Sequence, residues 1–520
     1  MNKIFKLSLL TLMVIIVTSC DKGFDELNTS KTGALVLDPA LVLNNASINS
    51  SPGGVGTNPG SPTASLVYDM AIVQQMISSN SGVLLGGNFN QVNIGNTPLT
   101  WVNYFQNVIK YTNDVITRTK SDPLRANLYN MARIIQANAF IVLTDTYGNI
   151  PYTEAGAGYT SQNFFPKYET QESIYPKIIQ ELTEATAALD AAGKIETSDV
   201  LFNGDIAKWK KFGYSLLLRA GMRLSKIDNA KAQATVAAAF AGGVILTNAD
   251  NVIIKHDANY QNGIGNVVNG TEAANCYLAE PFVNALKNSN DPRLSAIAVR
   301  YVGAASGPDQ VAAVATTAPG NQYGMPMGSD DAAAQTAAIN AGLVSRYAFS
   351  QVDRNRMLKR TSPMFIVTAG QTNLLLAEAA ARGWIAGGNT AASDYFTTGI
   401  KSHMDQMALY DAGSAVAAAD RDDYADANPL DVTTLDASLA QINYQYWIAS
   451  FLHGHEAWAN FRRSGYPVLS VNPYPGKSVS FITRITYPPS EILVNSVNVQ
   501  DAITKMGGDN LDTRVWWDKQ

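Results

Sequence analysis

Apolar residues recur three and four positions apart through much of this sequence, and this spacing limits the folds that are open to it. Such a repeat places the apolar side chains on one face of a helix, whereas a half-buried strand would alternate every second residue. The repeat is clear at 66–77, 128–144, 174–189 and 209–224. Asp205 precedes the last of these and is a residue type that caps helix N-termini. We therefore expect successive helices that stack as hairpins.

Other parts of the chain add more helices and two segments of a different kind. Helical patterns cover 101–119, 364–385, 391–407 and 435–461, and 252–254 has the composition of a short strand. Two long segments, 257–275 and 303–341, are rich in Gly, Asn, Ala, Thr and Ser and lack periodicity. Loops of that length in a compact protein are usually functional or disordered. The prediction is a mostly α fold with long loops and few short strands.

The N-terminal end indicates export and lipid anchoring. Two lysines precede an apolar run, 7–17, which is shorter than the roughly 20 residues that span a bilayer. Val17-Thr18-Ser19-Cys20 then resembles a bacterial lipobox, in which the cysteine is acylated after cleavage. An ordinary signal peptide that contains a cysteine is the alternative. We predict a lipoprotein signal peptide at 1–19 and attachment to outer-membrane lipid through acylated Cys20, because several acyl chains make a stable anchor.

Breaks in composition divide the rest of the chain. Residues 20–60 contain Pro- and Gly-rich breakers and few periodic signals, which predicts an irregular, lipid-anchored tether. Residues 61–520 would then form a single helical domain with loop-rich insertions at about 257–350. No other stretch of about 18 apolar residues occurs, so no other segment is expected to cross a membrane.

Charge and cysteine usage narrow the function further. The formal net charge is −5, and removal of Lys3 and Lys6 with the leader takes it to −7. Nucleic-acid binding needs a basic face, so no nucleic-acid partner is expected. If Cys20 carries lipid, Cys276 is alone and no intramolecular disulfide can form. Stability must then come from packing and hydrogen bonds.

Six motifs occur in order along the chain. They are FDELNT (24–29), LTDTYGNIPY (143–152), PKYETQESIY (166–175), GDIAKWKKF (204–212), LAEAAARGW (376–384) and EAWANFRRSGYP (456–467). Together they run over nearly the whole mature chain, which makes them far more specific than any one alone. The set resembles the SusD/RagB family of outer-membrane nutrient-binding lipoproteins, within its SusD-like branch, with one departure at Ser30-Lys31, where the family has Asn-Pro.

The resemblance implies a fold, a partner and a function. Members of the family have tetratricopeptide-like helix pairs and act as the lid of a SusC-like, TonB-dependent outer-membrane transporter. They capture oligosaccharide, or peptide in some relatives, outside the cell. The resemblance therefore implies a lipid-anchored surface protein of a Bacteroidetes-type bacterium that delivers nutrient and has no enzymatic activity.

Most of the matched motif residues have a structural interpretation. Asp145 lies at an expected helix end, and we expect it to bond nearby backbone or an arginine. A catalytic role would need a partner acid or histidine, and none is tied to it. Arg219 and Arg223 are four apart, which predicts a shared helix face and a buried ion-pair network. The Arg462-Arg463 pair is expected to form a local salt-bridge group with Glu456.

No metal site or cofactor is expected from the sequence. His453 and His455 are two apart and converge poorly from a helix, and no HExxH pattern is present. The acidic stretch from Asp420 to Asp431 lacks the glycine and terminal glutamate of an EF-hand, so a solvated loop is expected there. A structural Ca²⁺ at this stretch is the alternative.

Ligand-binding residues are sought on loops that combine aromatic rings with amides or carboxylates. A ring face stacks on the CH groups of a sugar, and planar polar groups bond its hydroxyls. Two loops have this composition and occupy the places where the family has its binding loops. The alternative is that these aromatics only anchor their own loops. The candidates are Asn80, Phe89, Asn90 and Gln91 on the first loop, Tyr260, Asn262, Asn275 and Tyr277 on the second, and Tyr323 on a third.

Two other functions stay open at this point. A surface glycan hydrolase would need two carboxylates roughly 5–10 Å apart, and no pair stands out in the sequence. No GxSxG, P-loop or dinucleotide fingerprint is present either. A purely structural subunit that completes the transporter lid without binding ligand is the second alternative. The seven tryptophans lie mostly in expected helices or near the C-terminal end, which keeps peptide or a small ligand open.

Overall fold

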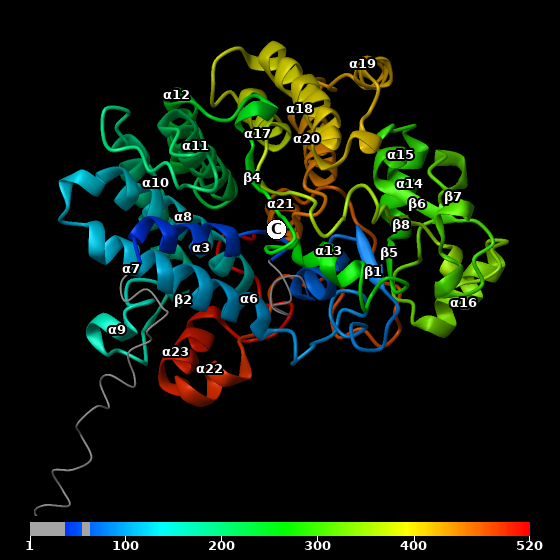
Figure 1. Cartoon of the computed structure of the whole chain (residues 1–520), viewed down its shortest axis with the longest axis horizontal. Coiled ribbons are helices and arrows are strands. Elements are labelled where there is room, and N and C mark those ends of the chain that lie inside the picture. The colour runs from blue at the N-terminus through cyan, green and yellow to red at the C-terminus, as the bar shows by residue number, and fades with distance from the viewer. Residues whose placement is uncertain (1–36, 55–62, 520) are drawn as a thin grey trace, which may run out of the picture.

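The computed structural model describes residues 37–54 and 63–519, and helices dominate both ranges (Figure 1). The predicted signal peptide and Cys20 lie outside the described residues. The α-helices are α3 (Pro39–Asn49), α5 (Met70–Ile72), α6 (Pro98–Asn103), α7 (Lys110–Thr119), α8 (Ala126–Tyr147), α9 (Gly158–Ser161), α10 (Gln171–Ala187), α11 (Ile206–Arg223), α12 (Asn229–Gly242), α13 (Gly263–Val268), α14 (Glu280–Asn288), α15 (Arg293–Ile297), α16 (Asp331–Asn340), α17 (Ala369–Ala381), α18 (Gly388–Tyr410), α19 (Ala418–Ala427), α20 (Leu435–Ala449), α21 (Gly454–Ser464), α22 (Pro489–Val494) and α23 (Ser496–Met506).

The strands are short and pair in four small sheets. β1 pairs with β5, β2 with β3 and β4 with β9, and β6 lies between β7 and β8, all antiparallel. Their bounds are β1 (Met76–Ser78), β2 (Ile150–Pro151), β3 (Tyr168–Glu169), β4 (Val252–Ile254), β5 (Cys276–Leu278), β6 (Ala298–Tyr301), β7 (Ala315–Thr316), β8 (Gln351–Val352) and β9 (Met364–Val367). The predicted class, mostly α with few short strands, is confirmed.

Helices that follow one another in sequence pack side by side. α7 contacts α8, α8 contacts α10, α10 contacts α11, and α11 contacts α12. α17 then packs on α18 and α20. Figure 1 shows the hairpins as one stack, from α7 on the left to α18 and α20 at the top. Side-chain caps fix where these helices begin: Asp205 accepts from the Lys208 N–H and Thr170 from the Ser173 N–H. The expected hairpins and the cap at Asp205 are therefore present.

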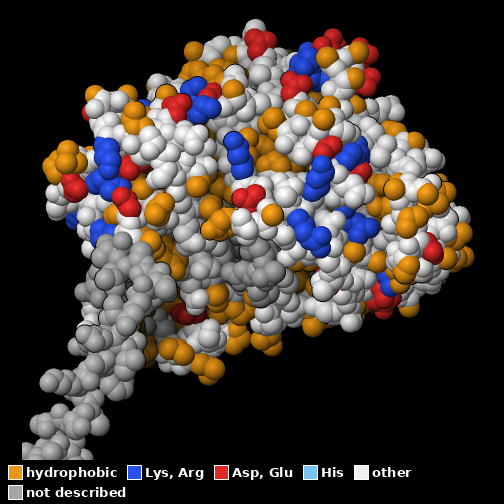
Figure 2. Space-filling model, in the orientation of Figure 1, with side chains coloured by type: hydrophobic (Ala, Val, Ile, Leu, Met, Phe, Trp, Pro, Cys, Tyr) orange, Lys and Arg blue, Asp and Glu red, His pale blue; other side chains and the backbone are white. Residues whose placement is uncertain are grey.

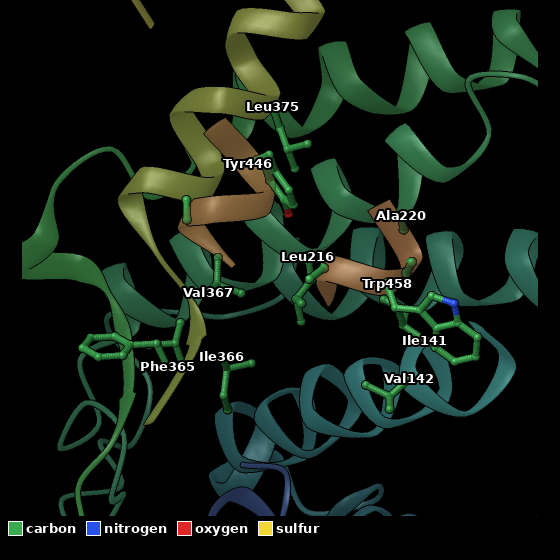
Figure 3. Close-up of a cluster of buried hydrophobic side chains, with 14 of the residues drawn as sticks. Ile141, Val142, Leu216, Ala220, Phe365, Ile366, Val367, Leu375, Tyr446 and Trp458 are labelled. Carbon is green, nitrogen blue, oxygen red and sulfur yellow. The ribbon is translucent and has the colours of Figure 1, made fainter. Parts of the chain in front are cut away.

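The core lies where α8 and α11 meet β9, α17, α20 and α21. Figure 3 shows Ile141 and Val142 of α8 facing side chains of α11, β9, α17, α20 and α21. Leu216, Tyr446 and Trp458 in this cluster are all at most 1% exposed. Fully burying such a side chain contributes roughly 1.5–3 kcal/mol. One apolar interior thus holds α8 and α11 against α17, α20 and α21.

Segments at the right of Figure 1 form the loop-rich part. β1 pairs with β5 in the register Met76↔Leu278, Ile77↔Tyr277 and Ser78↔Cys276. Ile77 and Tyr277 belong to a second apolar cluster with Met325 and residues of α16. This pairing brings loop 79–97 against the segment before β5. Chain parts about two hundred residues apart therefore share one surface.

Several expectations about local structure are wrong. Residues 39–49 form α3, capped by Asp38 and packed on α7, where an irregular tether was expected. The 66–77 segment is helical only as far as Ile72, and Gln74 (φ 58°) lies in the turn before β1. Residues 364–367 form β9, because four buried apolar residues suit a strand as well as a helix. The 435–461 helix is interrupted at Leu452 (φ 66°). Within the expected loops, 263–268 and 331–340 are helical.

A buried ion network on α11 joins two of the family motifs. The Arg223 Nε lies 3.1 Å from an Asp145 carboxylate oxygen, and its Nη2 lies 2.6 Å from Glu456. Arg219 contacts the same Glu456 oxygen at 3.2 Å. The indole Nε1 of Trp517 donates to Asp145 at 2.9 Å. The predicted network of Arg219 and Arg223 is confirmed, as is the arginine partner of Asp145.

The Arg462-Arg463 pair differs from the expectation. Arg463 makes a two-pronged contact with Glu378 of α17, at 2.7 Å for each nitrogen. Arg462 stacks on Trp458, 3.8 Å from the ring centroid, and donates to the carbonyls of Asp145 and Thr483. Helix geometry turns both guanidinium groups toward other helices. The pair therefore makes long-range contacts and no local salt bridge with Glu456.

The histidines and the acidic stretch have packing roles in the described residues. His455 Nδ1 lies 2.9 Å from Asp69, and burial lowers the pKa of His453. Residues 418–427 form α19 instead of the expected loop, and Figure 2 shows acidic side chains over it at the upper right. Arg421 and Lys401 bind Asp422 there. Within 37–54 and 63–519, no group of three or more His, Cys, Asp or Glu is placed to hold a metal ion.

The helices of the described residues differ from membrane spans, and some of them expose apolar side chains. Across the described ranges, no helix combines the length and apolar character that a membrane span requires. Exposed apolar side chains gather on α22 and α23, along the lower edge of Figure 2, where Leu493 and Val497 are about four-fifths exposed (80% and 81%).

The contact between α10 and α11 gives a prediction about stability. A Cβ built on Gly213 would lie 2.0 Å from Thr186 Oγ1, and the buried threonine has little room to move. We expect Gly213→Ala to lower the free energy of unfolding by roughly 1–3 kcal/mol. Gly320→Ala is the matched control, because nothing lies within 4 Å of its Cβ. Equal denaturation midpoints for the two variants would contradict this packing.

Candidate functional site

A cavity of about 400 Å³ lies where two of the predicted binding loops meet the start of α16. Ser79, Asn80 and Ser81 line one side, Asn275 lies beside them, and Asp330 and Asp331 form the opposite wall with Leu84 and Ala332. The β1–β5 pairing is what brings Asn80 and Asn275 together. Two of the predicted residues therefore share one surface hollow.

A hydrogen-bonded group holds the α16 wall in place. The Ser79 hydroxyl donates to Asp331 Oδ1 at 2.6 Å. Arg346 lies 2.9 Å from Asp331 Oδ2 and also donates to Ser79. The guanidinium stacks on the Tyr347 ring, 4.3 Å from its centroid. Asp330 caps α16 by accepting from the Ala333 N–H. The wall is thus ordered before any ligand arrives.

The facing side is organised around Glu272. Its carboxylate accepts from the Asn80 amide at 3.0 and 3.2 Å and from the Asn275 amide at 3.0 Å. The Asn80 side-chain oxygen accepts in turn from the Gly82 N–H. These bonds engage both amides, and Asn275 keeps a second N–H. The carboxylate oxygens can still accept hydrogen bonds from hydroxyl or amino groups.

The other residues of the first predicted loop anchor it. Phe89 is 7% exposed and stacks flat on Tyr474, with ring centroids 3.7 Å apart. Asn90 has φ 50° and donates to the carbonyls of Val479 and Ser480. Gln91 donates to the carbonyl of Gly476. The loop is therefore fastened to the segment 474–480, and these three side chains are engaged within the protein.

The remaining predicted residues are scattered. Tyr277 is fully buried, and its hydroxyl donates to the Ala274 carbonyl. Asn262 is also fully buried, and it caps α13. Neither side chain presents a surface to a ligand. Tyr260 is 55% exposed, but it does not line the cavity. Tyr323 is 36% exposed, and its ring lies under Lys287 and Arg300.

Sequence reasoning missed the acidic and cationic members of the site. Glu272, Asp330, Asp331 and Arg346 were not among the candidates. A signal existed for Asp330, since an aspartate before an alanine-rich run is typical of a helix N-cap. No comparable signal marks Glu272, because its partner Asn80 lies 192 residues away in the sequence. The site is consequently more acidic than the predicted residues suggest.

A larger cavity, of about 500 Å³, lies elsewhere, beside Gly148, the start of α10 and the C-terminal segment. Its amides are already occupied: Asn149 bonds the Gln171 N–H and the Ala502 carbonyl, and Gln171 bonds Thr144 and Trp517. The smaller cavity is the better candidate, because its carboxylates retain accepting capacity and it lies on the loops.

The whole chain is similar to known proteins in sequence and in fold. A family profile described as "Starch-binding associating with outer membrane", the SusD-like group, matches residues 48–488. A solved chitin-binding protein is 29% identical with a TM-score of 0.81, over 93% of this chain and 100% of its own. A SusD-like protein of Bacteroidetes AC2a is 26% identical with a TM-score of 0.78, over the same shares.

A third structure is similar in fold. It is a chitin-binding SusD homologue from Flavobacterium johnsoniae, 23% identical, with a TM-score of 0.75 over 93% of this chain and 99% of its own. No curated protein matches this sequence significantly.

Proposed function

Because the chain belongs to the SusD-like family, we propose that it binds an oligosaccharide at the cell surface and delivers it to a SusC-like, TonB-dependent outer-membrane transporter. We further propose that acylated Cys20 holds it in the outer membrane, facing the exterior. Proteins of this family bind, and catalysis forms no part of the proposal. The family resemblance and the chitin-binding relatives support a carbohydrate ligand.

The loop cavity is the observation that carries the proposal within this molecule. Amides and carboxylates from three distant segments converge there, and hydroxyl groups are the natural partners of such a set. The Phe89–Tyr474 stack stiffens the adjoining loop, and Tyr474 is only half-buried. A preordered polar wall lowers the entropic cost of binding.

Calorimetry with the full-length protein in detergent tests the ligand class. Soluble α-glucans, chito-oligosaccharides and a set of short peptides would be titrated in parallel. We expect one oligosaccharide class to bind and Asn80→Ala to weaken that binding about tenfold, which is about 1.4 kcal/mol. The reason is that Glu272 loses the amide that holds its carboxylate at the cavity. Asn340→Ala, at the exposed far end of α16, is the control.

Other outcomes separate the alternatives. If only peptides bind, the ligand is a peptide and not a sugar. If nothing in the set binds, the result would favour a lid subunit that binds ligand only together with its transporter. Steady release of reducing ends from a bound glycan would show a hydrolase. A transporter of barrel size should also co-purify from native membranes, and its absence would count against the delivery role.

A further inference from the structure

We infer that the cavity between loop 79–84 and α16 selects sugars that carry a protonated amine over sugars that carry a carboxylate or sulfate. This inference rests on the proposed function, because it names the charge of the ligand for the same site. It is carried by two features of the described residues: the balance of charge around the cavity, and the shortage of free hydrogen-bond donors in it.

The charge balance is negative. Three carboxylates surround the cavity: Glu272, Asp330 and Asp331. Within the described part of the chain, Arg346 is the one cation that forms an ion pair with any of them, and it binds Asp331. Glu272 is held by two neutral amides, and Asp330 by a backbone N–H. Two negative charges are therefore left without a counter-ion.

The helix dipole at the N-terminus of α16 makes the potential in the cavity more positive, but its effect is smaller than that of the carboxylates. The free N–H groups at a helix start correspond to about half a positive charge. Asp330 and Asp331 both lie at that end, so they more than offset it. The cavity keeps a net negative potential of somewhat over one charge by this estimate. An anionic sugar would meet repulsion here, and an ammonium group attraction, roughly as 332/(ε·r) predicts.

The hydrogen-bond inventory points the same way. The Asn80 amide and one N–H of the Asn275 amide bond Glu272, and the Ser79 hydroxyl bonds Asp331. Arg346 contacts Asp331, Ser79 and Tyr347. A ligand carboxylate would find few donors, such as the second N–H of Asn275 and the Ser81 hydroxyl, and would meet the carboxylates beside them. An ammonium group brings three donors of its own and finds carboxylate oxygens in excess.

A titration of three oligosaccharides of equal length into the full-length protein in detergent tests the inference. The three are a glucosamine oligomer, its N-acetylated form and an oligouronide, at a pH where the free amine is protonated. We expect the glucosamine oligomer to bind about tenfold more tightly than the neutral form, and the uronide to bind most weakly. Added salt should reduce the difference, as it does for solvent-accessible charges.

Two isosteric variants identify the residues. Asp330→Asn keeps a side chain that caps α16, and Glu272→Gln keeps an oxygen that accepts from the amides. Each should lower the preference for the glucosamine oligomer over the neutral oligomer at least threefold, measured as the ratio of the two affinities in the same variant. Asp512→Asn, an exposed acid away from the cavity, is the control.

The outcomes are distinct. Equal affinity for the three sugars, a preference for the uronide, or a preference that survives both variants would overturn the charge selection and leave the proposed function standing. If none of the three sugars nor any other glycan binds, the proposed function fails, and this inference fails with it.

Discussion

Replacing Arg223 by methionine is expected to lower the free energy of unfolding by about 3–5 kcal/mol. The Arg223 side chain is fully buried and is the one link between the carboxylates of Asp145 and Glu456 in the described network. Methionine fills a similar volume but leaves Asp145 without a cation. A buried carboxylate without its partner is strongly destabilising, even where the intact pair adds little over an apolar replacement.

Urea denaturation at neutral pH, followed by tryptophan fluorescence, measures this effect. Arg118→Met is the matched control, because Arg118 forms an exposed pair with Asp114 one helical turn away. Exposed pairs of that kind contribute roughly 0–1 kcal/mol. A midpoint for Arg223→Met within error of the Arg118 control would show that the buried network does not hold the helices together.

Acid is expected to unfold the protein steeply between about pH 4.5 and pH 2. Burial opposes ionisation of Glu378 and Glu456, but neighbouring arginines outweigh it and lower the pKa of each to about 2 from 4.5. A lowered pKa means that the stabilisation is complete above the unfolded-state pKa and is lost as the pH falls toward the folded-state pKa. Each group then contributes roughly 3 kcal/mol at neutral pH.

Stability measured in urea from pH 7 to pH 2 tests this linkage. Glu378→Gln should be less stable at pH 7, because Arg463 and Arg382 lose their carboxylate. Its stability should also fall less between pH 4.5 and pH 2 than that of the unmodified protein. Asp501→Asn, which removes an exposed partner of Lys505, should leave the pH dependence unchanged. Parallel pH curves for Glu378→Gln and the parent would refute the assignment.

Most helices can be predicted from the sequence, because apolar spacing and capping residues are local signals. The spacing of Arg219 and Arg223 placed them on one face, and Asp205 marked a helix start. Their partner Glu456 was not accessible as such, because it lies 233 residues from Arg223. The sequence predicts helix where strand β9 lies for a related reason. Four consecutive apolar residues show no helical or strand periodicity, and only their pairing with β4 makes them a strand.

The site was predicted in part for the same physical reason. Composition identified loops with amides, and Asn80 and Asn275 do line one cavity. Aromatic content was a poorer guide, since Tyr277 lies on a strand whose three residues are all buried and stacking on Tyr474 buries Phe89. The acids that give the cavity its charge follow from how β1, β5 and α16 meet. That arrangement depends on contacts between distant parts of the chain.

The closing tryptophan has a consequence for biosynthesis. Trp517 has no exposed surface, and it donates to Asp145, a residue that leaves the ribosome some 370 positions earlier. The hydrogen-bonded cluster around Asp145 is therefore complete only after the residues near Trp517 have been translated. Contacts of such wide sequence separation slow folding, because the loop between them must be ordered first. A chain that ended before Trp517 would leave its buried Asp145 without the indole donor.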